Sequence, residues 1–112
     1  MVRTPTDQSV TVSELIANLP IGAEATTSRV VVDTPAIRVV MFAMDAGQEL
    51  TDHSSPRAVV VQVLAGSLDF SYAGTGSLLE AGDVVYLAPG ERHAVVANTP
   101  CHFALTLIDL AA

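Results

Sequence analysis

Residues 47–93 decide the fold of this chain. They begin GQELTDHSSPRAVVVQVLAG (47–66) and end AGDVVYLAPGERH (81–93). The stretch contains two of the three histidines, His53 and His93, together with a long β-branched run and several glycine turns. Such runs bounded by turn residues are typical of short strands. We therefore expect this stretch to form most of a small barrel and to place both histidines at one cavity.

The rest of the chain continues the alternation of β-branched runs and turn residues. The expected strands are SRVVVDT (28–34), IRVVMFAM (37–44), ELTDH (49–53), AVVVQVL (58–64), SLDFSYA (67–73), SLLEA (77–81), VVYLA (84–88), RHAVVAN (92–98) and HFALTLIDL (102–110). Eight or nine short strands at near-regular spacing predict an all-β sandwich or barrel.

One short N-terminal helix is also expected, at residues 13–19. Ser13 suits an N-cap, Glu14 places an acid in the first turn, and Pro20 would end the helix. Residues 1–10 are mostly polar, and we expect them to form a flexible arm.

The composition limits the classes of function. The chain has 112 residues, of which 50% are hydrophobic, and this length predicts a single domain, 1–112, with a barrel core at about 29–109. The net charge of −7 excludes the basic stripe that nucleic acid requires and disfavours anionic membranes. With no apolar signal core and no run of about 18 apolar residues, we expect a cytoplasmic protein.

A single cysteine, Cys101, excludes an internal disulfide framework. Because it has no basic neighbour, we expect it to be a buried free thiol.

The apolar strands favour a homodimer. Strands such as residues 58–64 are apolar on both faces, and a partner subunit would cover the outer one.

His53, Ser55 and His93 are the candidate polar groups of a ligand cavity. Ser55 is two residues after His53, so both side chains point the same way in an extended chain. In the following strand Val59 and Val61 share one face, and we expect these valines to line the cavity. Two histidines at strand ends, each after a glycine turn, suit a binding site in a barrel mouth.

This stretch resembles the cupin superfamily, specifically a small single-domain, RmlC-like cupin. The first cupin motif is Gly, five residues, His-x-His, three or four residues, Glu, six residues and Gly; here Gly47, His53, Ser55 and Gly66 follow that frame. The resemblance implies a double-stranded β-helix, or jelly-roll-like, barrel.

The second motif is Gly, five residues, Pro-x-Gly-x-x-His, three residues and Asn. Gly82, Gly90 and His93 follow it, with Ala88 at the proline position and Asn98 one place late. Together the two motifs cover about half of the chain.

The departures from the cupin frame concern the metal ligands. Metal-holding cupins use both histidines and the glutamate of the first motif and the histidine of the second. Here Ser55 replaces the second histidine, and Val59 or Val60, depending on the register, replaces the glutamate. The resemblance thus leaves His53 and His93 as candidate ligands of a divalent ion (Zn, Fe, Ni or Mn), with no tightly bound metal as the favoured expectation.

Three functions remain open from the sequence. The first is a barrel that binds a small molecule near His53 and His93. The second is a metal-dependent oxygenase or isomerase with an atypical ligand set, for which Glu49 or His102 would be the third ligand. The third is a metal-free acid/base enzyme in which Glu49 would orient a histidine. Arg57 is a further candidate, able to hold a carboxylate or phosphate at the cavity mouth.

Overall fold

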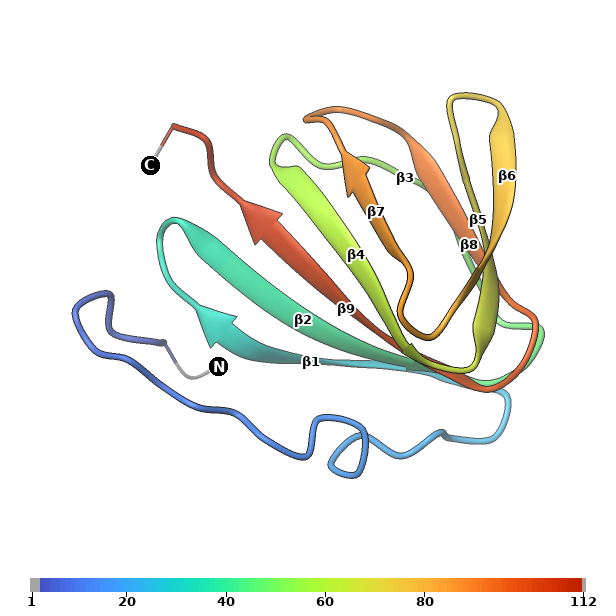
Figure 1. Cartoon of the computed structure of the whole chain (residues 1–112), viewed down its shortest axis with the longest axis horizontal. Helices are drawn as coiled ribbons and strands as arrows, with labels where there is room; N and C mark the ends of the chain where they lie inside the picture. The colour runs from blue at the N-terminus through green and yellow to red at the C-terminus, as the bar shows by residue number, and fades with distance from the viewer. Residues whose placement is uncertain (1–2, 112) are drawn as a thin grey trace.

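The computed structural model describes residues 3–111, which form nine strands (Figure 1). The strands are β1 (Thr26–Asp33), β2 (Ile37–Met44), β3 (Glu49–His53), β4 (Ala58–Ala65), β5 (Ser67–Tyr72), β6 (Thr75–Glu80), β7 (Val84–Leu87), β8 (His93–Ala97) and β9 (Cys101–Ile108). The expected all-β class is confirmed, and every expected strand is present with its ends shifted by at most a few residues.

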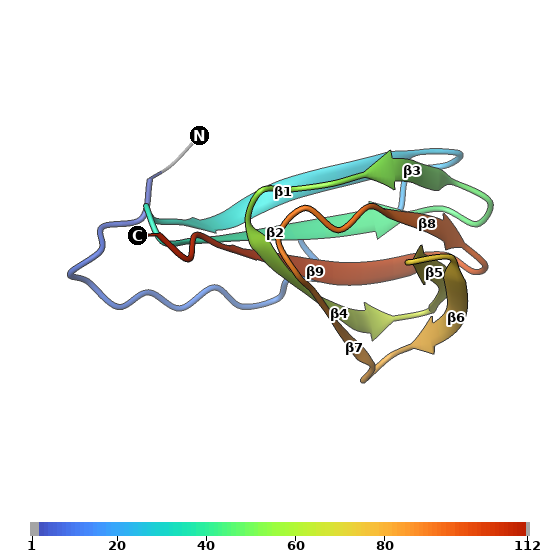
Figure 2. The ribbon, with the colours of Figure 1, turned by 90° about the horizontal axis from the view of Figure 1, so that it is seen from above.

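The strands form two antiparallel sheets. The five-stranded sheet has the order β1-β2-β9-β4-β7, and the four-stranded sheet has the order β3-β8-β5-β6. Figures 1 and 2 show the two sheets curving around a common interior. The last strand, β9, lies in the middle of the larger sheet, between β2 and β4.

The helix expected at residues 13–19 is wrong. This segment makes one turn at residues 15–18, and residues 3–111 contain no helix. Glu14 enters the turn at a φ of +56°, in the left-handed region that a right-handed helix does not use. So short a segment gains too few hydrogen bonds to offset helix nucleation. Accordingly, no helix in the described part of the chain is long and apolar enough to cross a membrane.

The N-terminal segment runs outside the barrel, below β1 in the view of Figure 1. Residues 1 and 2 of the expected flexible arm lie outside the described residues. Further along, the backbone N–H of Thr4 donates to the carbonyl of Asp33 (3.0 Å), and the N–H of Asp33 donates to the Thr4 hydroxyl (3.0 Å). His102, on β9, contacts the Leu19 carbonyl through Nε2 (2.7 Å). These bonds hold the segment to the outer side of the larger sheet.

The core lies between the two sheets. Val59, Val61 and Val63 of β4 are buried, whereas Gln62 is exposed, so the odd-numbered valines face inward. The most buried large side chains of this core are Phe70, Phe103, Met44, Leu68 and Leu87. At one end of this core the space is not filled by side chains, and that space is the candidate site.

Gly66 links β4 to β5 and lies against the loop before β9. Its φ is +75°, and a Cβ at this position would overlap the carbonyl oxygen of Pro100 and lie 2.9 Å from Cys101 Cα. Both neighbours are backbone atoms, so neither can move aside without moving a strand. Ser67, the next residue, is bonded to the same loop, where its N–H donates to the Thr99 hydroxyl (2.9 Å).

We expect Gly66→Ala to destabilise the fold by about 3 kcal/mol or more, because it adds backbone overlap to left-handed strain. Gly74→Ala is the matched control, since Gly74 has a φ of +76° and a Cβ added there would meet nothing within 4 Å. The control should cost about 1 kcal/mol, the left-handed strain alone. Urea denaturation of both variants measures the difference, and equal losses of stability would contradict the contact with Pro100.

Candidate functional site

A cavity of about 240 Å³ lies between the sheets, at the end where β3 finishes with His53 and β8 begins with His93. Its apolar walls come from both sheets and include Val40, Leu105 and Leu107 from the larger sheet and Leu50, Phe70 and Val95 from the smaller. Its polar groups are His53, Ser54, Ser55 and His93. An apolar cavity with a few polar groups on one side has the usual composition of a small-molecule site.

His53 and His93 are brought together by strand pairing. They are direct partners in the β3–β8 ladder, and their ring centroids lie 6.5 Å apart. His53 is exposed at the rim, and His93 is half-buried. The ring of His93 is stacked on that of Phe70, with centroids 5.7 Å apart and an interplanar angle of 8°.

The turn before β8 orients His93. Nδ1 of His93 lies 3.3 Å from the Glu91 carbonyl oxygen, to which it donates in the tautomer that leaves Nε2 as the acceptor. The same turn is tied to the β3–β4 loop, because the N–H of Gly90 donates to the Ser55 carbonyl (2.7 Å). The two cupin-like motifs therefore meet in space at this rim.

A β-bulge at the end of β3 determines which side chains reach the cavity. The register shifts between Leu50 and His53, and Asp52 has a φ of +54°. As a result Leu50 and His53 both line the cavity, although their spacing would put them on opposite faces of a regular strand. Glu49 is exposed and does not line the cavity, although its spacing of four residues from His53 would put both side chains on one face of a regular strand.

Asp52 and Arg92 form an ion pair on the outer side of the rim. Arg92 Nε donates to Asp52 Oδ1 (2.8 Å), and Arg92 Nη2 contacts the second carboxylate oxygen. This hydrogen bond, assisted by the charge of Arg92, holds the pKa of Asp52 below its usual value. Both side chains are well exposed, so the pair fixes the geometry of the rim and adds little stability.

His102 and Cys101 do not belong to the cavity. His102 neighbours the inward-facing Phe103 on β9 and therefore faces the N-terminal segment, where Nε2 meets the Leu19 carbonyl. Cys101 is fully buried, and burial raises the pKa of its thiol to about 11. The free, buried thiol expected from the sequence is confirmed.

The sequence-predicted cavity residues are placed as follows. His53, Ser55, Val59 and His93 line the cavity, whereas Val61 is buried in the adjoining core. Sequence reasoning missed the aromatic wall formed by Phe42, Phe70 and Phe103. The signal for Phe70 was its place on the alternating face of β5, but nothing local distinguishes a cavity wall from a filled core.

The residues present do not fit a cupin metal site. Within the described residues, no three His, Cys, Asp or Glu side chains are grouped to hold an ion. The ring centroids of His53 and His93, 6.5 Å apart, are also too far apart for one tetrahedral ion. Two imidazoles on one tetrahedral ion would have centroids about 5.3 Å apart, given a metal–nitrogen bond of about 2.1 Å.

Comparison with solved structures shows where this architecture recurs. A conserved protein of unknown function from Streptococcus pyogenes is 23% identical, with a TM-score of 0.85, covering 100% of this chain and 98% of that one. An RmlC-like cupin from Desulfovibrio desulfuricans is 21% identical, with a TM-score of 0.80, covering 89% and 97%. The DMSP lyase from Ruegeria pomeroyi is 20% identical, with a TM-score of 0.70, covering 78% and 49%.

These similarities establish the fold. Of the three proteins named, one carries an activity in its name, the DMSP lyase, so the set indicates no common function. No curated protein matches the sequence. The family model described as "Cupin domain" matches residues 40–108, which include His53, His93 and every strand from β3 to β9. The chain therefore belongs to the cupin domain family.

Proposed function

We propose that this protein binds a small, largely apolar molecule in the cavity between its sheets. The observation that carries the proposal is a cavity of about 240 Å³ whose polar groups are confined to the rim formed by His53, Ser55 and His93. Val59 and the aromatic wall supply apolar surface. This surface favours apolar ligands, because their transfer from water into the cavity is favourable. The ring of His93, stacked on Phe70 and oriented by the Glu91 carbonyl, is the best-fixed hydrogen-bonding group.

Filling the cavity should weaken binding without unfolding the protein. We expect Val40→Phe to weaken binding of 1-octanol by about tenfold or more and to maintain or raise Tm, because the new ring occupies space that is now empty. Val39→Phe is the matched control. Val39 directly precedes Val40, so its side chain faces outward, and it is paired with Thr106 in the ladder. Chemical-shift titration measures both affinities; equal binding by the two variants would contradict a ligand in this cavity.

We infer that no metal ion is bound tightly at His53 and His93. Zinc enzymes use three protein ligands and non-haem iron oxygenases use two His and a carboxylate, and the positions that would complete either set are Ser55 and a valine. Glu49 and His102, the alternative third ligands, face away from the cavity. A metal-dependent oxygenase or isomerase is therefore the less favoured function.

Metal addition and removal test this inference. A site with an ion at 100 times its Kd would add about 2.7 kcal/mol of stability, equivalent to several degrees of Tm in a domain of this size. We expect neither EDTA nor added Zn²⁺, Ni²⁺, Mn²⁺ or Fe²⁺ to shift Tm of untagged protein. A shift that disappears in the His53→Ala, His93→Ala double variant would refute the inference.

We also propose that the protein forms a homodimer through the outer face of β4 and β7. Val84 and Tyr86 of β7 are 61% and 59% exposed, and they lie opposite Gln62 and Val60 in the ladder. No charged residue occupies the outward positions of β4 and β7. On a chain of net charge −7, such a face can meet its own copy about a two-fold axis without acid facing acid.

Charge introduced on this face should separate the subunits. We expect the wild type to be a dimer at micromolar concentration and the Val84→Glu, Tyr86→Glu double variant to be a monomer, by light scattering. Leu78→Glu on β6 is the control, because Leu78 is 55% exposed on the other sheet. A monomeric wild type, or a control that dissociates as readily, would contradict the assignment of this face.

A further inference from the structure

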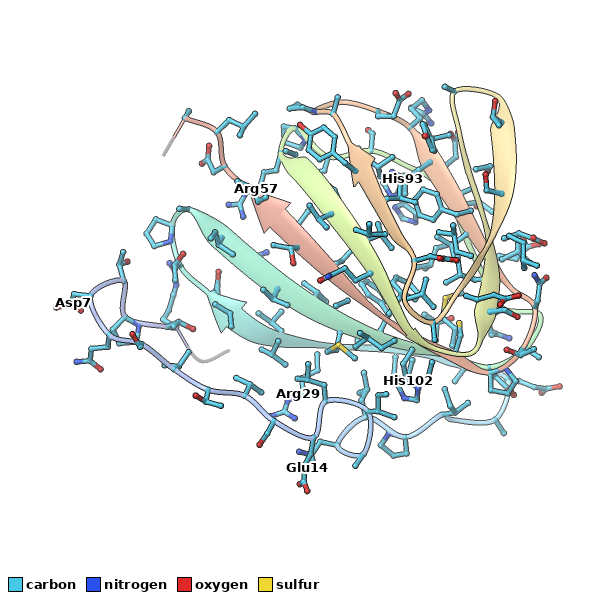
Figure 3. The ribbon with its side chains drawn as sticks, viewed as in Figure 1. Asp7, Glu14, Arg29, Arg57, His93 and His102 are labelled. Carbon is cyan, nitrogen blue, oxygen red and sulfur yellow. The ribbon has the colours of Figure 1, made fainter. Side chains whose placement is uncertain are left out.

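The imidazole of His93 presents one unused nitrogen to the cavity. His93 is the ladder partner of Tyr72 and its ring is stacked on the inward-facing Phe70, so the ring lies on the inner face of the smaller sheet. Figure 3 shows His93 at the end of the barrel where β8 begins. Its Nε2 has no hydrogen-bond partner among the described residues, yet this atom is not shielded from solvent. A molecule in the cavity that His93 lines can therefore reach it.

The contact at Nδ1 decides what Nε2 can do. Nδ1 of His93 lies 3.3 Å from the carbonyl oxygen of Glu91. A carbonyl oxygen only accepts, so Nδ1 carries the single proton of the neutral ring. Nε2 is then left with a lone pair and can only accept a hydrogen bond. A ligand that meets this nitrogen must supply a donor.

The hydroxyl of Ser55 has the opposite capacity on the same rim. Its oxygen accepts the backbone N–H of Arg57 (3.1 Å), and its own proton has no acceptor among the described residues. A serine hydroxyl can accept and donate at the same time. Ser55 lines the cavity together with His93, so the rim offers one acceptor and one donor. A ligand hydroxyl, which donates and accepts, is complementary to both.

The cavity lining is uncharged. Among the described residues that line it, none is Asp, Glu or Arg. Arg57, the residue expected to hold a carboxylate or phosphate, is not one of them. An ammonium or a carboxylate in this cavity would lose its hydration without meeting an opposite charge. The lining therefore favours a donor that carries no charge.

We propose that the cavity ligand is an uncharged alcohol whose O–H donates to Nε2 of His93 and whose apolar body fills the cavity. This inference rests on the proposed function and adds the ligand class. A site that pairs with a hydroxyl rejects the analogue that lacks it, because the polar group of the site is then left unpaired. The cavity of about 240 Å³ has room for about eight non-hydrogen atoms, taking about 30 Å³ for each.

The isomers 1-octanol and 1-methoxyheptane provide the test, because only the alcohol has a hydrogen-bond donor. The amine 1-octylamine adds a charged donor at about pH 8, where free imidazole is neutral. Each is titrated into wild type, His93→Phe and His53→Phe, with chemical shifts as the measure of affinity. His93→Phe removes the acceptor and keeps a ring that can stack on Phe70, whereas His53→Phe removes the other imidazole of the rim. His93→Leu replaces His93→Phe if circular dichroism shows that the latter has lost its structure.

We expect wild type and His53→Phe to bind the alcohol about tenfold more tightly than the ether or the amine. His93→Phe should bind the alcohol no better than the ether, with its affinity for the ether at least maintained. If wild type binds alcohol and ether equally, the cavity binds ligands but the hydroxyl site is refuted. A preference lost in His53→Phe and kept in His93→Phe refutes the role of His93, and tighter binding of the amine refutes an uncharged ligand. If none of the three binds, the proposed function fails, and this inference with it.

Discussion

The pairing of β9 with both β2 and β4 is the interaction on which the rest of this structure depends. Every residue of Cys101–Ile108 has a partner in β2, and most also have one in β4. Because neighbouring side chains in a strand face opposite ways, this register sends Phe103, Leu105 and Leu107 into the cavity and leaves Thr106 outside. A slip of one residue would exchange the two faces and remove the apolar wall.

Two local backbone features place the histidines at the cavity. The bulge at Asp52 turns His53 toward the cavity, and the bond from Gly90 to the Ser55 carbonyl brings the turn before β8 to the same rim. The Asp52–Arg92 pair joins these two segments from outside. The positions of both histidines are thus set by backbone geometry.

Loss of the usual ligands changes what a cupin barrel can do. Where Ser55 and a valine replace a histidine and a glutamate, the site lacks the donors that hold and tune a metal. The barrel keeps its cavity and an oriented imidazole. Such a site is suited to recognition of a shape, and a shared fold does not by itself select a reaction.

The sequence alone determined the class of fold, the nine strands and the motif histidines, because strand periodicity and glycine turns are local signals. It also determined that Ser55 and a valine occupy two of the four metal-ligand positions of the cupin motifs. Only the tertiary structure decided the rest. The helix at residues 13–19 failed because its propensity was too weak against a turn at Glu14, and Glu49 was misplaced because a bulge reverses strand parity. The cavity depends on how distant strands pack, which no local pattern encodes.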